Sequence, residues 1–92
     1  MSRYTVTWLE EAYDDLALIW LSSSDPNSIT RAADQLERQL ARDPYALADG
    51  CIEQTWTLTA FPLRILYAVS DADRIVRVIH IDIVSHKTNG SS

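Results

Sequence analysis

The chain is poor in cysteine, in glycine and in positive charge. Its one cysteine, Cys51, cannot form an internal disulfide, which fits a reducing compartment, so we expect a cytoplasmic protein. No apolar run approaches the roughly 18 residues that span a bilayer, and the first six residues lack the apolar region of a signal peptide, so no membrane partner is expected. With 13 acidic against 8 basic residues, the net charge of −5 argues against broad binding to nucleic acid, because such binding depends on neutralising phosphates.

The apolar content is sufficient for one hydrophobic core. The 92 residues and the hydrophobic fraction of 47% are typical of one ordered domain, which we assign to 1–92 with 88–92 as a loose tail. Charge is distributed unevenly along this domain. Residues 9–25 carry five acidic residues and no basic one, whereas residues 64–87 carry four basic residues, three acidic ones and two histidines. The second half therefore offers the better surface for an anion.

The first half of the chain predicts a strand followed by two helices. Residues 3–8 alternate between polar and apolar side chains, as a strand does. From Leu9 the apolar residues follow the i, i+3, i+4 spacing of a helix face, which ends in a run of serines at 22–24. Asp25-Pro26 then predicts the start of a second helix, and Asp43-Pro44 predicts its end. The short link makes the two helices an antiparallel hairpin.

The second half predicts three strands, at 52–59, 63–70 and 75–85, joined by short turns into an antiparallel meander. The last of these is rich in β-branched residues, which suggests a central strand buried on both sides. The order is strand, helix, helix, strand, strand, strand (β-α-α-β-β-β). We therefore predict an α+β fold, with an antiparallel sheet of about four strands, the helical hairpin on one face, and the first strand at its edge or in its middle.

The stretch from Phe61 to Val69 is the most informative, because it holds an arginine within an apolar strand. Pro62 fixes a turn, and strand pairing should begin just after it. Arg64 has the opposite parity to its apolar neighbours Leu63 and Ile65, and a buried guanidinium is costly without a partner. It must either pair with an acid on a neighbouring strand, such as Asp82, or face a groove where an anion could sit.

Several short stretches occur in an order and spacing that match a known family. They are residues 4–8 leading into 12–20, then 29–34, 43–44, Gly50, 56–58, 62–67 and 74–78. Together they resemble the RelE/ParE superfamily, the toxins of type II toxin–antitoxin systems, which include plasmid stabilisation proteins. The resemblance implies the β-α-α-β-β-β fold and growth inhibition by a toxin. It also implies a partner, a cognate antitoxin, part of which usually wraps the toxin, often through a helix on its surface.

Members of this superfamily differ in their targets: RelE-like toxins cleave messenger RNA on the ribosome, and ParE-like toxins inhibit DNA gyrase. The resemblance implies a catalytic role for Arg64 in a ribonuclease, with His86 and Lys87 as looser matches. Residues 53–57 hold none of the lysines of RNA-cleaving members, and no tyrosine follows Tyr67. We predict a ParE-like toxin that binds its target, with gyrase as a candidate. The alternatives are a ribosome-dependent mRNA endoribonuclease and an inactive member that still binds antitoxin.

Four residues are candidates for contact with a target or an antitoxin: Trp8, Arg64, Arg77 and His80. Trp8 could equally belong to the core. In a regular strand, His80, Asp82 and His86 share one parity with Val76 and Val78. Three ligands spread along one strand lie too far apart for a compact metal site, so we expect no metal, and no cofactor.

Overall fold

The computed structural model describes residues 3–84 and contains two helices and five strands. In chain order they are β1 (Thr5–Trp8), α1 (Glu10–Ser22), α2 (Pro26–Arg42), β2 (Gly50–Ile52), β3 (Thr55–Ala60), β4 (Leu63–Ser70) and β5 (Ile75–Ile83). Both helices begin and end close to the predicted positions. For α2 the reason is clear, because Pro26 opens the helix and Pro44 follows its end. Neither helix of the described residues is long and apolar enough to cross a membrane.

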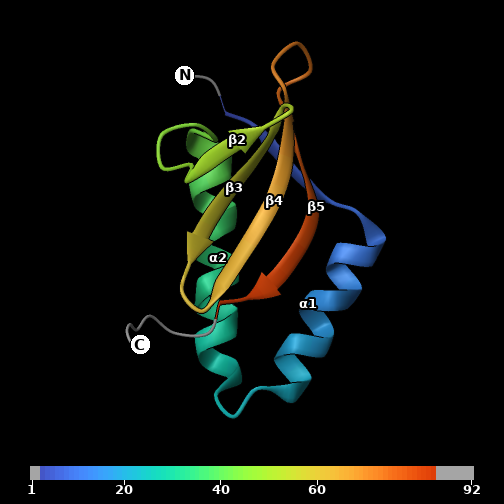
Figure 1. The fold of residues 1–92 in the computed structure, drawn as a ribbon, viewed down its shortest axis with the longest axis vertical. Helices are drawn as coiled ribbons and strands as arrows, with labels where there is room; N and C mark the ends of the chain where they lie inside the picture. Colours follow the sequence, from blue (N-terminus) through green and yellow to red (C-terminus); the bar gives the residue numbers. More distant parts are fainter. Residues whose placement is uncertain (1–2, 85–92) are drawn as a thin grey trace.

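The five strands form one mixed sheet in the order β1-β5-β4-β3-β2 (Figure 1). The α+β class is confirmed, but the sheet has five strands where we predicted about four, and it is not wholly antiparallel. β1 lies at one edge and runs parallel to β5, pairing Thr5 with Ile75 and Trp8 with Val78. A parallel neighbour needs a long connection, which the intervening helices and strands supply. This pairing makes β5 a central strand.

The additional strand comes from a turn inside the segment predicted as one strand at 52–59. The chain reverses at Glu53 and Gln54, whose φ values are 52° and 67°, and β2 pairs back on β3. Two consecutive residues in the left-handed region are the geometry of a tight type I′ hairpin turn. Such turns favour glycine, asparagine and aspartate, so the glutamate and glutamine at these positions gave no signal for it.

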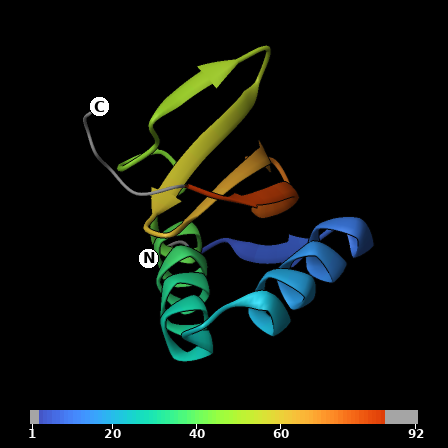
Figure 2. The same cartoon turned by 60° about the horizontal axis from the view of Figure 1, so that its bottom comes forward.

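The helices cover one face of the sheet and leave the other uncovered within the described residues (Figure 2). In the core, Leu36 and Leu40 of α2 lie with residues of β4 and β5 that are essentially inaccessible to solvent. The buried Tyr67 hydroxyl donates a hydrogen bond to the carbonyl of Pro44, which ties β4 to the end of α2. The full core is Ala12, Ile29, Ala32, Leu36, Leu40, Leu58, Ala60, Leu63, Ile65, Tyr67, Val76, Val78 and Ile81.

A bulge in β5 changes which residues face the helices. The register moves from Leu66 opposite His80 to Tyr67 opposite Val78, so Ile79 has no partner on β4. The predicted parity is therefore wrong: Val78 faces the core, whereas His80 and Asp82 lie on the uncovered face. The prediction that β5 is buried on both sides is also wrong, because that face is open.

Asp71, in the turn between β4 and β5, joins three distant parts of the chain. Its carboxylate accepts a hydrogen bond from the Tyr4 hydroxyl at 2.8 Å, and from the Tyr45 hydroxyl at 2.9 and 3.0 Å to its two oxygens. These bonds stabilise the charged form and lower the pKa of Asp71 below its ordinary value of 3.8. The guanidinium of Arg74 lies 5.3 Å from the centre of the Tyr4 ring and completes the cluster.

We expect Asp71→Asn to lower the melting temperature at pH 7, because asparagine keeps one acceptor but loses the charge. A carboxylate with a lowered folded-state pKa stabilises the protein above pH 3.8, and this contribution is lost as the pH falls through the lowered value. The difference between wild type and variant should therefore shrink in acid. Thermal unfolding followed by circular dichroism at pH 7 and at low pH measures it, and a difference that stays constant would assign the effect to packing instead.

Candidate functional site

The uncovered side of the sheet, which we call the open face, carries the polar residues that point away from the helices. Along β4 and β5 it presents Arg64 opposite Asp82, Leu66 opposite His80, and Ala68 opposite Arg77. Thr59 of β3 lies on the other side of Arg64. Three of the four predicted contact residues, Arg64, Arg77 and His80, are thus brought onto one surface, and all three are solvent-exposed.

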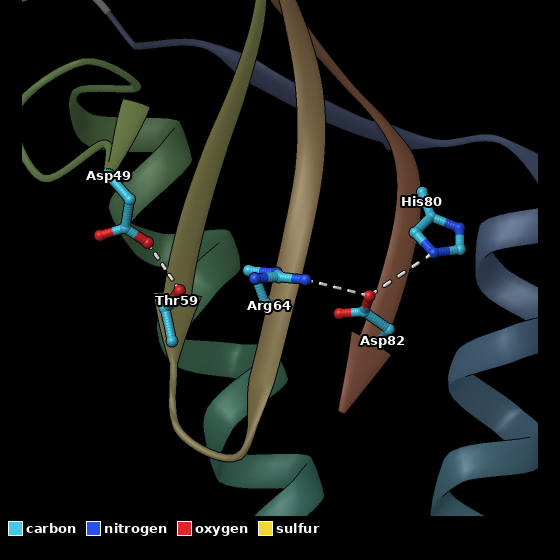
Figure 3. A network of polar contacts seen from close by, with 5 residues as sticks. All are labelled: Asp49, Thr59, Arg64, His80 and Asp82. Atoms are coloured by element: carbon cyan, nitrogen blue, oxygen red, sulfur yellow. Dashed lines mark hydrogen bonds and ion pairs between the residues drawn. The ribbon is translucent and has the colours of Figure 1, made fainter. Parts of the chain in front are cut away.

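Asp82 lies between two of these groups (Figure 3). Its Oδ2 atom is 3.4 Å from Nη2 of Arg64 and 3.8 Å from Nε2 of His80. The side chains of Arg64 and Asp82 are 49% and 39% exposed, so the pair contributes at most about 1 kcal/mol to stability. Of the alternatives for Arg64, the pair with Asp82 is confirmed, and the guanidinium also remains reachable from solvent.

The other oxygen of Asp82, Oδ1, is buried and has no hydrogen-bond partner among the described residues. An acceptor in this position has lost its water without gaining a donor, and such atoms are uncommon in folded proteins. Because Oδ1 is buried, a partner at the open face meets this carboxylate through Oδ2, beside Arg64 and His80.

A second carboxylate, that of Asp49, is held by Thr59, the residue opposite Arg64 on β3. The Thr59 hydroxyl donates a hydrogen bond of 2.6 Å to Oδ2 of Asp49, which stands in the loop before β2 (Figure 3). Arg64 is thus flanked across both neighbouring strands by Asp82 and by the threonine that Asp49 holds. A phosphate approaching the guanidinium would meet negative charge nearby, which weakens this position as an anion site.

Trp8, the fourth predicted contact residue, lies on the other side of the sheet. Its indole N–H donates a 2.7 Å hydrogen bond to Oε2 of Glu37 on α2, and its ring meets that of Tyr13 edge to face at a centroid distance of 6.2 Å. The structure therefore separates Trp8 from Arg64, Arg77 and His80. Trp8 is partly buried and packs against the core on the side of the helices, not on the open face.

Two of the predicted catalytic residues, His86 and Lys87, lie outside the described residues. Within residues 3–84 no three side chains of the metal-binding types gather in one place. Sequence reasoning missed Asp49 and Thr59. Thr59 could have been found, because a tight turn at Pro62 places residues 59 and 64 opposite each other, whereas the position of Asp49 depends on how the preceding loop folds.

Comparison with solved structures shows which known proteins this chain is similar to in fold. A chain of the toxin–antitoxin complex RelBE2 from Mycobacterium tuberculosis superposes with a TM-score of 0.74 at 21% identity, over 90% of this chain and 93% of that one. A chain of the ParDE system of Pseudomonas aeruginosa gives 0.66 at 19% identity, over 89% and 97%. The isolated RelE toxin of Escherichia coli gives 0.64 at 15% identity, over 91% and 87%.

The chain has the RelE/ParE fold. This confirms the fold expected from the resemblance, and the likeness extends along nearly the whole of each compared chain. No protein-family model matches the sequence, and no curated protein matches it significantly. Because both RelE and ParE chains share the RelE/ParE fold with this protein, the fold itself does not distinguish a ribonuclease from a toxin that acts by binding.

Proposed function

We propose that this chain is the toxin of a type II toxin–antitoxin system, which inhibits growth by binding a cellular target and is neutralised by a cognate antitoxin. The fold supports the general assignment, because the similar structures come from RelBE and ParDE systems and from RelE. Such a role places the protein in the cytoplasm, and DNA gyrase is the candidate target of a ParE-like member. The open face, with Arg64, Arg77 and His80, is the surface that we assign to the target.

The pairing of Arg64 with Asp82 is the observation that favours binding over RNA cleavage. Cleavage through attack of a 2′-hydroxyl needs several donors aimed at the charge that develops on phosphorus. Here the residues that flank Arg64 on the neighbouring strands are Thr59 and Asp82, and neither is basic. An exposed guanidinium paired with a carboxylate offers both donors and an acceptor, which suits the mixed donors and acceptors of a protein surface.

Inducing the chain alone in a bacterial host tests this function. We expect growth arrest with signs of gyrase inhibition, such as a DNA-damage response, and with messenger RNA intact. Arg64→Ala should relieve the arrest. Arg38→Ala is the matched control, because Arg38 is also exposed and also paired with an aspartate, Asp34 at 2.8 Å, but it lies on α2.

Other outcomes would point to the alternatives. Messenger RNA cut at ribosomes in the wild type, and intact with Arg64→Ala, would establish the endoribonuclease. Normal growth during induction of a folded wild-type protein would contradict toxicity and leave the inactive, antitoxin-binding member. Equal relief by Arg64→Ala and Arg38→Ala would remove the open face from the proposal.

A further inference from the structure

The bulge in β5 decides which side chain lies opposite Arg64. Beyond the bulge toward the turn, Tyr67 lies opposite Val78. A regular ladder continued from that pair would put Ile81 opposite Arg64. The bulge moves the register by one residue, so Asp82 takes that place instead. Bulges often re-aim a side chain beside a functional site, and here the bulge supplies Arg64 with a carboxylate as its neighbour.

The carboxylate of Asp82 meets solvent through one oxygen only. Its Oδ1 is buried, whereas Oδ2 lies 3.4 Å from Nη2 of Arg64 and 3.8 Å from Nε2 of His80 (Figure 3). Both distances are longer than the roughly 2.7–2.9 Å of a tight charge-assisted hydrogen bond. Asp82 therefore acts on Arg64 mainly through its charge, and the guanidinium keeps N–H groups that a partner can reach.

The neighbour of Arg64 on the other side does not help it to bind a phosphate. Thr59 lies opposite Arg64 on β3, and its hydroxyl donates a 2.6 Å hydrogen bond to Oδ2 of Asp49. A hydroxyl has a single proton to donate, so Thr59 cannot also donate to a phosphate held by Arg64. The two strands that flank Arg64 thus present acceptors and negative charge where a phosphate needs donors.

We propose that Asp82 sets the specificity of the open face: it makes Arg64 unsuitable for phosphate, so that the face accepts a protein partner and rejects nucleic acid. The matching protein surface presents an acceptor to the N–H groups of Arg64 and a donor to Oδ2 of Asp82. A backbone phosphate supplies acceptors only, and its charge is repelled by Oδ2. The inference rests on the proposed function, in which the open face contacts the target, and names the residue that selects the class of target.

Removing the charge of Asp82 at constant size tests this role. We expect Asp82→Asn to bind a labelled single-stranded RNA of about 20 nucleotides about tenfold more tightly than the wild type, in fluorescence polarisation at low salt. Asp34→Asn is the matched control, because it makes the same change in net charge and Asp34 is also paired with an arginine, Arg38 at 2.8 Å, on α2. It should bind RNA as the wild type does. Equal tightening by both variants would assign the gain to net charge and overturn the proposal.

Further variants show whether the gain acts through Arg64. Arg64→Ala/Asp82→Asn should return to wild-type affinity, and Asp82→Glu, which keeps the charge, should not gain affinity. Asp82→Ser also removes the charge and should reproduce the gain, so the test does not depend on one substitution. The gain should steepen the salt dependence by about one phosphate contact, a change that loosened packing does not produce. Tight RNA binding by the double variant or by Asp82→Glu would contradict the proposal.

Induction of the same variants in a bacterial host separates this inference from the proposed function. We expect Asp82→Asn to weaken the growth arrest, because the partner loses its charged acceptor, and Asp82→Glu to preserve it. RNA binding by the wild type as tight as that of Asp82→Asn would refute the role of Asp82, and growth arrest would still support the toxin. Normal growth on induction of the wild type, with the RNA gain present in Asp82→Asn, would refute the toxin function and leave the exclusion of phosphate standing.

Discussion

Raising the pH from 10 to 12 should sharply destabilise this protein, because burial raises the pKa of Tyr67 to about 12 from the ordinary value of 10.0. The Tyr67 ring lies in the core and its hydroxyl donates a hydrogen bond to the carbonyl of Pro44, so a phenolate at this position would have no water to stabilise its charge. The pKa of Tyr45 is also raised to about 12, first by partial burial and then by the hydrogen bond to Asp71.

The direction of the effect follows from linkage. In the unfolded chain a tyrosine ionises near pH 10, whereas in the folded protein Tyr67 keeps its proton until about pH 12. Its contribution to stability is complete below pH 10 and is lost as the pH rises through 12. For one buried group, a difference of this size corresponds to about 3 kcal/mol, a large part of the stability of a small domain.

Denaturant unfolding at pH 8, 10, 11 and 12 measures this loss, and Tyr67→Phe is the control. That variant should be less stable at neutral pH by about 1–3 kcal/mol, because the buried Pro44 carbonyl loses its donor. It should also lose less stability between pH 10 and 12, since the ionising group is gone. Parallel decline of wild type and Tyr67→Phe would show that other groups govern alkaline unfolding.

The elements that follow local periodicity were predictable from the sequence. α1 and α2 were found from apolar spacing and from Pro26 and Pro44, and β4 from the alternation after Pro62. The turn at Glu53–Gln54 was not predictable, because its residues are not those that favour positive φ. The edge position of β1, parallel to β5, depends on the packing of the whole chain, and the residues of β1 alone do not determine it.

The candidate site was likewise predictable from the sequence only in part. The exposure of Arg64 follows from strand alternation, whereas its register opposite Asp82 depends on the bulge in β5. The face of His80 depends on the same bulge, which one aliphatic residue, Ile79, forms within a run of similar residues. The bulge brings His80 and Asp82 onto the open face together with Arg77. A regular strand would have placed His80 on the opposite side from Arg77.

The open face carries two exposed arginines, Arg64 and Arg77, so its role in binding a target should be separable from the binding of an antitoxin elsewhere. The double variant Arg64→Glu/Arg77→Glu reverses the charge offered to the target. We expect it to restore colony formation on induction to the uninduced level, and to co-purify with the antitoxin as the wild type does.

Colony counts on induction measure the first effect for the wild type and the double variant, and co-purification with the product of the adjacent short open reading frame measures the second. Growth arrest by a folded double variant would remove the open face from the proposed function.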